Sequence, residues 1–331
     1  MDLIITIDTE ADNAWGRSRE VTTRNTRFLP RFQRLCDRFG FRPTYLCAYE
    51  MAADPEFQET VGPWQAAGRA EIGAHLHPWT NPPFEACDVD GHLHHPFPHE
   101  LPIDLFERKL TVLTEAIAGA FGRRPTSYRA GRYGFDAPHI GVLRKLGYRV
   151  DCSVTPYCSW SHATGLPGGR GGMDFRRARP CPYVLDDADV TRPGSSGLLE
   201  VPMTILFPRW PLRRSDLLQR LYGRMVPPGH AQVLARRGLG PRWFRPLRDT
   251  TAADLIEVWD AAEEAGLPCA EMMFHSSELM PGGSPMFPDE PAIERLYELF
   301  ENAFAAFAGR GAAGVCLSAY ADGVGKGDGV R

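Results

Sequence analysis

Two short stretches of this 331-residue sequence each carry a pair of reactive side chains two residues apart: two acids in the first and two histidines in the second. Asp8 and Glu10 follow the apolar run LIITI, and His75 and His77 follow a second apolar run within EIGAHLHPW. A carboxylate and two imidazoles are a common ligand set for a hydrolytic Zn²⁺ that keeps one position open for water. The alternative is a polar, proline-broken loop that is merely rich in histidine.

Three more polar residues, Arg129, Asp151 and His275, follow other short apolar runs. A carboxylate near the metal could take a proton from water, and a separate histidine could give one to a leaving group. Arg129 could hold the basic carboxylate, and Asp151 could orient His275. Each residue also has an ordinary alternative as a cap, an ion pair or a core histidine. Together they favour metal-assisted hydrolysis of an amide or ester.

The elements that must position these residues alternate along the chain. Strands are predicted at 3–7, 43–49, 71–75, 126–130, 148–154, 198–206, 270–275 and 314–320. Helices are predicted at 24–40, 55–68, 103–121, 137–147, 251–265 and 289–308. About seven strand–helix repeats indicate an α/β fold with a parallel sheet, either closed into a barrel, which the length favours, or open. The strand ends of such a sheet meet on one face, so the candidate residues should converge there.

Composition limits the classes of partner and location. The chain has a formal charge of −4 and a pI near 6.2, which give no electrostatic reason to expect nucleic acid or an anionic membrane as partner. No apolar run approaches the ~18 residues of a membrane span. The N-terminus lacks the features of a signal peptide, and the eight cysteines form no CxxC pair, so we expect a cytoplasmic protein with reduced thiols.

The domain organisation is predicted to be simple. We expect one domain over 1–331, because the sequence shows no internal repeat and no interdomain linker. Two loop-rich excursions interrupt the repeats, at about 157–195 and 207–250.

Five stretches then occur in a fixed order: TIDTEAD (6–12), EIGAHLHPW (71–79), SYRAGRYG (127–134), VDCSVTP (150–156) and FHSSELMPGGSP (274–285). They resemble the five signature segments of the polysaccharide deacetylases, carbohydrate esterases of family 4 with the NodB homology domain. The resemblance is greatest to the WalW-like branch, which is associated with surface-glycan gene clusters. It implies a distorted (β/α)₇ barrel that removes an acetyl group from an N-acetylated sugar or glycan precursor, in surface polysaccharide or lipopolysaccharide biosynthesis.

The resemblance also implies roles at the metal. Asp8 matches the catalytic base, and Glu10 takes the place of the metal-binding acid, one residue later than the family's usual Asp-Asp pair. His75 matches the first metal histidine. The second usually stands where this chain has Trp79, so His77 is the nearby substitute.

For the remaining residues, the resemblance makes Arg129 the group that orients the base, Asp151 the acid that tunes the general acid, and His275 the general acid. Zn²⁺ is the expected metal, and the ligands also suit Co²⁺, Ni²⁺ or Mn²⁺. Two other functions stay open: a deformylase or amidase of a smaller substrate on the same fold, and a catalytically silent glycan-binding member.

Other features allow two interpretations each. A proline-rich loop is favoured over a second metal site for His92, His94, His95 and His99. Stacking on sugar rings or burial of apolar area would both suit Trp79, Tyr133, Trp160 and Trp210. A solvated basic face is favoured over an anion site for Arg176, Arg177 and Arg179.

Overall fold

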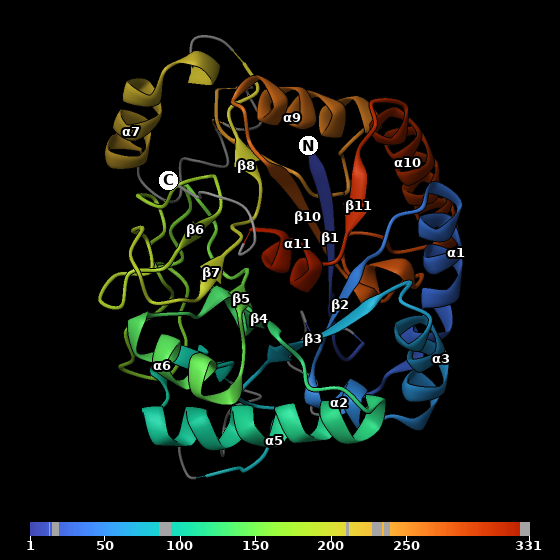
Figure 1. The fold of residues 1–331 in the computed structure, drawn as a ribbon, viewed down its shortest axis with the longest axis vertical. Coiled ribbons are helices and arrows are strands. Elements are labelled where there is room, and N and C mark those ends of the chain that lie inside the picture. The colour runs from blue at the N-terminus through green and yellow to red at the C-terminus, as the bar shows by residue number, and fades with distance from the viewer. Residues whose placement is uncertain are drawn as a thin grey trace.

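A computed structural model of the chain describes residues 1–12, 14, 20–85, 94–209, 212–226, 234 and 239–324. Its centre is a curled sheet that forms a half-barrel (Figure 1). In order across the sheet the strands are β10 (Cys269–His275), β1 (Asp2–Thr9), β2 (Thr44–Cys47), β3 (Glu71–Leu76), β4 (Ser127–Ala130), β5 (Val150–Asp151), β7 (Leu199–Glu200) and β6 (Tyr183–Val184). Neighbouring strands are parallel except β6 and β7. The predicted α/β barrel-type fold is confirmed.

Helices surround this sheet (Figure 1). They are α1 (Leu29–Phe39), α2 (Tyr49–Ala52), α3 (Pro55–Ala66), α5 (Ile103–Phe121), α6 (Ala137–Leu146), α9 (Ala252–Glu264) and α10 (Glu290–Gly309), with α7 (Asp216–Met225) farther out. Helices α1, α5 and α6 end at Gly40, Gly122 and Gly147, whose φ angles of +69°, +69° and +92° suit glycine at a helix C-terminus. In the described part of the chain, no helix is long and apolar enough to cross a membrane.

Side-chain alternation along β1 separates the core from the barrel interior. Leu3, Ile5 and Ile7 belong to the large apolar core that the outer helices cover. Ile4 belongs to a smaller interior cluster, and Asp8, four residues later, lies on the same face of the strand. The interior is therefore apolar at the amino end of β1 and charged at its carboxyl end.

The C-terminal part of the sheet differs from the prediction. The strand expected over 314–320 is wrong beyond Val315, because β11 (Ala313–Val315) pairs with β1 and the chain then forms α11 (Leu317–Val324). A short apolar run suits a buried strand and a buried helix equally, which explains the error. Leu317 and Tyr320 of α11 pack into the interior cluster with Ile4.

The strand predicted over 198–206 is also two separate strands. β7 ends at Glu200, and β8 (Ile205–Leu206) pairs in a second sheet with β9 (Arg242–Trp243). Pro202 lies between them and has no N–H to give to a ladder. Just after it, Thr204 contacts β10: its N–H donates to the Glu271 carbonyl at 3.3 Å, and its Oγ1 accepts from the Glu271 N–H at 2.8 Å.

The excursion 157–195 consists mostly of turns, with β6 and two isolated bridges, Ser159–Asp174 and Leu185–Pro193. The single domain over 1–331 stays a prediction.

Candidate metal and catalytic site

The ends of β1 and β3 bring one acid and two histidines together. Glu10, His75 and His77 are buried, and one potential ligand atom from each lies within 4.8 Å of the others. Glu10 Oε2 is 2.6 Å from His77 Nε2 and 3.6 Å from His75 Nε2. Spacings of two residues place each pair of side chains on the same side of an extended chain, so both His-x-His and Asp-x-Glu point inward.

Contacts with neighbouring residues fix the two imidazole rings. His75 Nδ1 lies 3.1 Å from the carbonyl oxygen of Arg129, which can only accept, so this nitrogen carries the proton and Nε2 is left as a ligand. The His77 ring packs against Trp79, with ring centroids 4.4 Å apart. A Cβ at Gly131 would lie 2.5 Å from His77 Nδ1, so the glycine makes room for this ring. Trp79 therefore supports the His77 ring.

Asp8 is held by a buried arginine. Arg129 is fully buried and donates from NH1 to Asp8 Oδ1 at 2.6 Å and from NH2 to Glu271 Oε1 at 2.7 Å. Its Nε donates to the Cys152 carbonyl at 2.9 Å. These three hydrogen bonds fix the guanidinium, which in turn orients Asp8 so that Oδ2 lies 3.8 Å from His75 Nε2.

The charges in this cluster favour a cation. Burial raises the pKa of Asp8, but Arg129, His75 and His275 outweigh it and lower that pKa overall. Burial also raises the pKa of Glu10, and hydrogen bonds from His75 and His77 lower it well below its usual value. Burial lowers the pKa of His75, but Asp8 and Glu10 raise it more. Two ionised carboxylates therefore face two imidazoles in a buried space, and one oxygen and two nitrogen donors fit a divalent metal.

His275 approaches the cluster from β10. Its Nε2 lies 3.8 Å from Asp8 Oδ2 and 3.7 Å from Glu10 Oε1. Its Nδ1 is 3.0 Å from Arg245 NH2, and Arg245 also donates to Glu278 Oε1 at 2.8 Å. Because a guanidinium only donates, Nδ1 must accept, and the neutral ring carries its proton on Nε2. Glu278 Oε2 also accepts from the His275 backbone N–H at 3.0 Å.

The structure does not bring Asp151 to His275. Its neighbours Val150 and Cys152 belong to the interior cluster, so the period of two turns Asp151 outward. Its carboxylate accepts from the Ser153 N–H at 2.9 Å and from the Ser153 hydroxyl at 2.8 Å. The contacts that we expected from Asp151 come from Arg245 and Glu278 instead.

Sequence reasoning missed three residues of this cluster. Glu271 stands four residues before His275 in a buried strand, so strand periodicity alone could have placed both on one face. Glu278 lies three residues after His275, a spacing that is typical of a helix start. Arg245 lies in the second excursion, and no local pattern indicates its contact with His275.

Aromatic side chains border the site. Tyr133 stacks on Trp160 with ring centroids 5.3 Å apart, and Trp243 lies 6.1 Å from Trp160. Burial raises the pKa of Tyr133, whose hydroxyl donates to Met273 Sδ at 3.8 Å. Arg132 and Tyr133 have φ angles of +53° and +59°, a left-handed backbone that is uncommon outside glycine and is often found at functional sites. Trp210 lies outside the described residues.

A buried lysine holds the loop after His77. Lys109 of α5 donates from Nζ to the carbonyls of Pro78, Asn81 and Pro83 at 3.0, 2.6 and 2.8 Å. Asn81 returns a hydrogen bond to the Lys109 carbonyl at 2.8 Å. The three protons of the ammonium group are thus satisfied by the chain that follows a candidate metal ligand.

The described histidines of the proline-rich loop have other contacts. His95 stacks on Trp79 with centroids 4.5 Å apart, and His99 Nε2 donates to the Gly171 carbonyl at 2.8 Å. In the ranges that the structure covers, His94, His95 and His99 form no second group of three metal-ligating residues. His92 lies outside the described residues.

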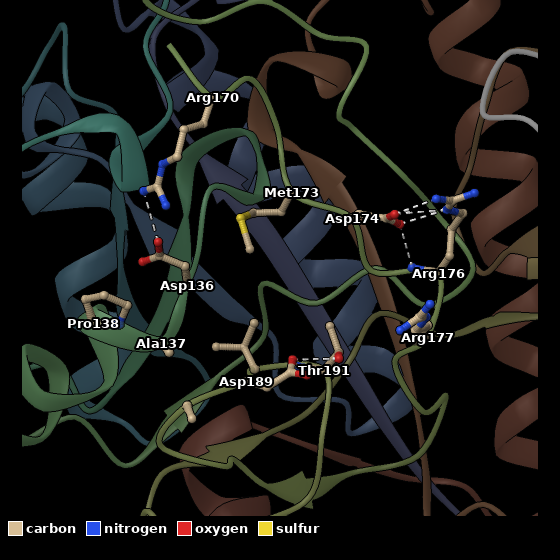
Figure 2. A pocket seen from close by; sticks show the side chains of 12 residues that line it. Asp136, Ala137, Pro138, Arg170, Met173, Asp174, Arg176, Arg177, Asp189 and Thr191 are labelled. Carbon is tan, nitrogen blue, oxygen red and sulfur yellow. Dashed lines mark hydrogen bonds and ion pairs between the residues drawn. The ribbon is translucent and has the colours of Figure 1, made fainter. Parts of the chain in front are cut away.

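A cavity of about 810 Å³ lies between the start of α6 and the first excursion (Figure 2). Figure 2 shows Arg170 pointing to Asp136 on one side and Arg176 to Asp174 on the other. Arg177 also lines it. No candidate catalytic residue lines this cavity, and two of its three arginines are paired with acids.

No protein-family model matches the sequence, and a search of curated proteins finds no match. Among solved structures, the fold is similar to that of a candidate polysaccharide deacetylase from Mycobacterium smegmatis, with a TM-score of 0.53 and 17% identity over 97% of this chain and 90% of that one. A family 4 acetyl xylan esterase from Clostridium thermocellum, in complex with cobalt, gives a TM-score of 0.44 and 11% identity over 98% and 92% of the two chains. A family 4 pseudoenzyme from Bacillus anthracis gives 0.43 and 11% over 97% and 66%. The first likeness establishes the fold alone, and the other two carry no argument. The chain therefore has the fold of the NodB-type polysaccharide deacetylases.

Proposed function

We propose that this protein is a metal-dependent hydrolase that removes an acetyl group from an N-acetylated sugar or glycan precursor. The observation that carries the proposal is the meeting of Glu10, His75 and His77 beside a separately held base, Asp8, and a separately held proton donor, His275. A carboxylate fixed by a buried arginine, next to a site with three potential metal ligands, is what hydrolysis of an amide by an activated water requires.

Glu10, His75 and His77 would hold the divalent metal, with Zn²⁺ as our first choice and Co²⁺, Ni²⁺ or Mn²⁺ as alternatives. When bound, the metal would polarise both a water molecule and the acetamide carbonyl. The chain's own residues supply the rest. Asp8 Oδ2 accepts the proton of the attacking water while Arg129 holds Oδ1 in place.

His275 completes the reaction on the leaving-group side. Arg245 donates to Nδ1, so the ring proton sits on Nε2 and faces the reacting groups. As this proton passes to the departing amine, the proton that Asp8 took from water replaces it on Nε2, which lies 3.8 Å from Asp8 Oδ2. Burial of both Asp8 and Glu10 reduces competition from bulk water and strengthens their electrostatic interactions. In this proposal, Arg129, Arg245 and Glu278 are positioning residues.

A sugar substrate is supported by the aromatic cluster Tyr133–Trp160–Trp243 beside the site, since aromatic faces bury the apolar faces of sugar rings. We further propose that the chain belongs to the WalW-like branch and acts in the cytoplasm on precursors of surface polysaccharide or lipopolysaccharide. Those parts of the proposal rest on the sequence stretches that resemble that branch.

The test is acetate release from N-acetylated chito-oligosaccharides by protein loaded with Zn²⁺, with Asp8→Asn as the inactive control. Equal amounts of acetate and free amine, absent in the variant, would support the deacetylase. Formate from N-formyl analogues, without acetate from the N-acetyl compounds, would favour the deformylase. Sugar binding without any hydrolysis by the metal-loaded protein would favour the silent glycan-binding member.

A further inference from the structure

The segment 207–248 differs in charge from the rest of the chain. It contains ten arginines and a single acidic residue, Asp216, whereas the whole chain has 37 basic and 41 acidic residues and a net charge of −4. The overall charge therefore conceals a strongly basic segment. Some of its arginines serve the fold, such as Arg242 with Asp254 and Glu257, but Arg209 is exposed.

Helix α7 lies in this segment, at the periphery of the molecule (Figure 1), and exposes apolar side chains. Leu218, Leu221 and Met225 are 37%, 39% and 74% exposed, and their spacing of three and four residues places them on one helix face. Leu239, farther along the segment, is 54% exposed. Of the seven exposed large apolar side chains among the described residues, four thus lie within 218–239.

The adjacent side of α7 attaches it to the protein. Tyr222 packs edge-on against Phe207 with ring centroids 4.9 Å apart, and Gln219 Oε1 accepts from the Tyr157 hydroxyl at 2.9 Å. These contacts hold the helix so that Leu221 and Met225 stay in contact with solvent.

Helix α1, by comparison, is an amphipathic helix whose apolar face is covered by the rest of the protein. Its apolar residues Leu29, Phe32 and Leu35 are buried. Its arginines pair with glutamates of α10, as Arg31 does with Glu294 and Arg38 does with Glu301. The apolar face of α7 has no such cover among the described residues, although α7 is also strongly amphipathic and of low overall hydrophobicity.

We propose that α7 docks on a membrane surface that contains anionic phospholipid. The exposed leucines and methionine would enter the boundary between headgroups and acyl chains, and the excess positive charge of the segment would attract the anionic headgroups. The sequence places two more arginines, Arg220 and Arg224, in the same helix. At ten residues α7 is too short to span a bilayer, so the helix would lie in the membrane plane.

A lipid surface suits this segment better than a nucleic acid or a protein partner. Binding to the phosphates of a nucleic acid would use the arginines but would leave the exposed apolar face without a role. A protein partner could cover the apolar face, but it would also need an acidic surface to match the arginines. A membrane with anionic lipid supplies both an apolar layer and negative charge. Docking would bring the proposed deacetylase to lipid-linked precursors, but the inference does not depend on that activity.

The experiment is co-sedimentation of the full chain with vesicles of phosphatidylcholine, with and without phosphatidylglycerol. We expect binding to the anionic vesicles, at least about tenfold weaker binding to the neutral ones, and a steep loss of binding at high salt. The variant Leu221→Gln/Met225→Gln should bind the anionic vesicles at least about tenfold less. Ile103→Gln, which removes an exposed apolar side chain at the start of α5, is the matched control and should bind like the wild type.

Thermal unfolding of all variants checks that they fold, which we expect because the replaced side chains are exposed. Absence of wild-type binding to anionic vesicles would overturn the proposal, as would equal binding by the double variant and the wild type. A concentration-dependent dimer in light scattering that the double variant loses, without vesicle binding, would show that a second copy covers the helix and would also overturn it.

Discussion

Asp8 and His275 are register partners on the neighbouring parallel strands β1 and β10, and Asp8 Oδ2 lies 3.8 Å from His275 Nε2. They are 267 positions apart in the chain, yet the pairing of the first and tenth strands places base and proton donor side by side. His75 and Arg129 are register partners in the same way on β3 and β4. The sheet therefore sets the geometry of the site through strand register.

Replacing Asp8 tests the base. Asp8→Asn keeps the shape of the side chain and an oxygen that can accept from Arg129, but it removes the proton acceptor. Turnover should fall by about 10²-fold or more, with metal content unchanged, as expected for loss of a general base. Steady-state kinetics and elemental analysis measure the two quantities. The same change at Asp174, which pairs with Arg176 on the surface, should leave turnover intact. Near-normal turnover of Asp8→Asn would refute the assignment.

Replacing Glu278 tests the support of His275. Glu278→Gln keeps the side-chain size but removes the charge partner of Arg245, so His275 should lose its fixed orientation. We expect kcat to fall about 10- to 100-fold while KM and metal content change little. Kinetics with one N-acetylated substrate measure this split. An unchanged kcat would show that His275 needs no such support, and a loss of metal would show that Glu278 acts on the metal ligands instead.

Replacing Lys109 tests the anchor of the loop after His77. Lys109→Met should lower the free energy of unfolding by about 3 kcal/mol, because two buried carbonyls and one partly buried carbonyl lose their donor. Urea denaturation measures this quantity. The control is Lys145→Met, which removes an exposed ion pair with Glu107 and should cost less than about 1 kcal/mol. Equal losses in the two variants would contradict a special role for Lys109.

The buried pair Asp151 and Glu200 predicts a pH-dependent stability. Burial and the neighbouring Asp151 raise the pKa of Glu200 well above its usual value. A raised pKa in the folded state means that stability is fully present below the unfolded pKa and is lost as the pH rises toward the folded pKa. Glu200→Gln removes this loss, and the amide can still accept from the Val154 N–H, as Glu200 Oε1 does at 3.0 Å.

The variant and the wild type should therefore be about equally stable near pH 4, and the variant should be more stable by more than about 1 kcal/mol near pH 8. Denaturant unfolding across this range gives both curves. Parallel curves would mean that Glu200 is ionised at little cost in the folded state.

Much of the site could be predicted because its residues follow strands. A buried apolar run that ends in Asp-x-Glu or His-x-His indicates both the strand and the face on which its acids or histidines lie. The structure brings Asp8, Glu10, His75, His77, Arg129 and His275 together. Their chemical roles stay predictions.

Contacts between residues that are far apart in the sequence could not be predicted. Arg245 reaches His275 from a loop excursion, and Lys109 reaches three loop carbonyls from the middle of a helix. The motif position of Asp151 predicts a contact with His275, but strand alternation turns Asp151 away. Such contacts depend on how the strands and loops pack, which local patterns do not encode.

The most direct test of the proposed metal site is metal content per chain, by elemental analysis, of protein purified without chelator and of its His75→Ala variant. We expect close to one divalent ion per chain in the wild type and little in the variant. His77→Ala should lose metal as well, because its Nε2 lies beside Glu10 and His75. Little metal in the wild type after soaking in Zn²⁺, or equal metal in the wild type and His75→Ala, would contradict the proposed metal site.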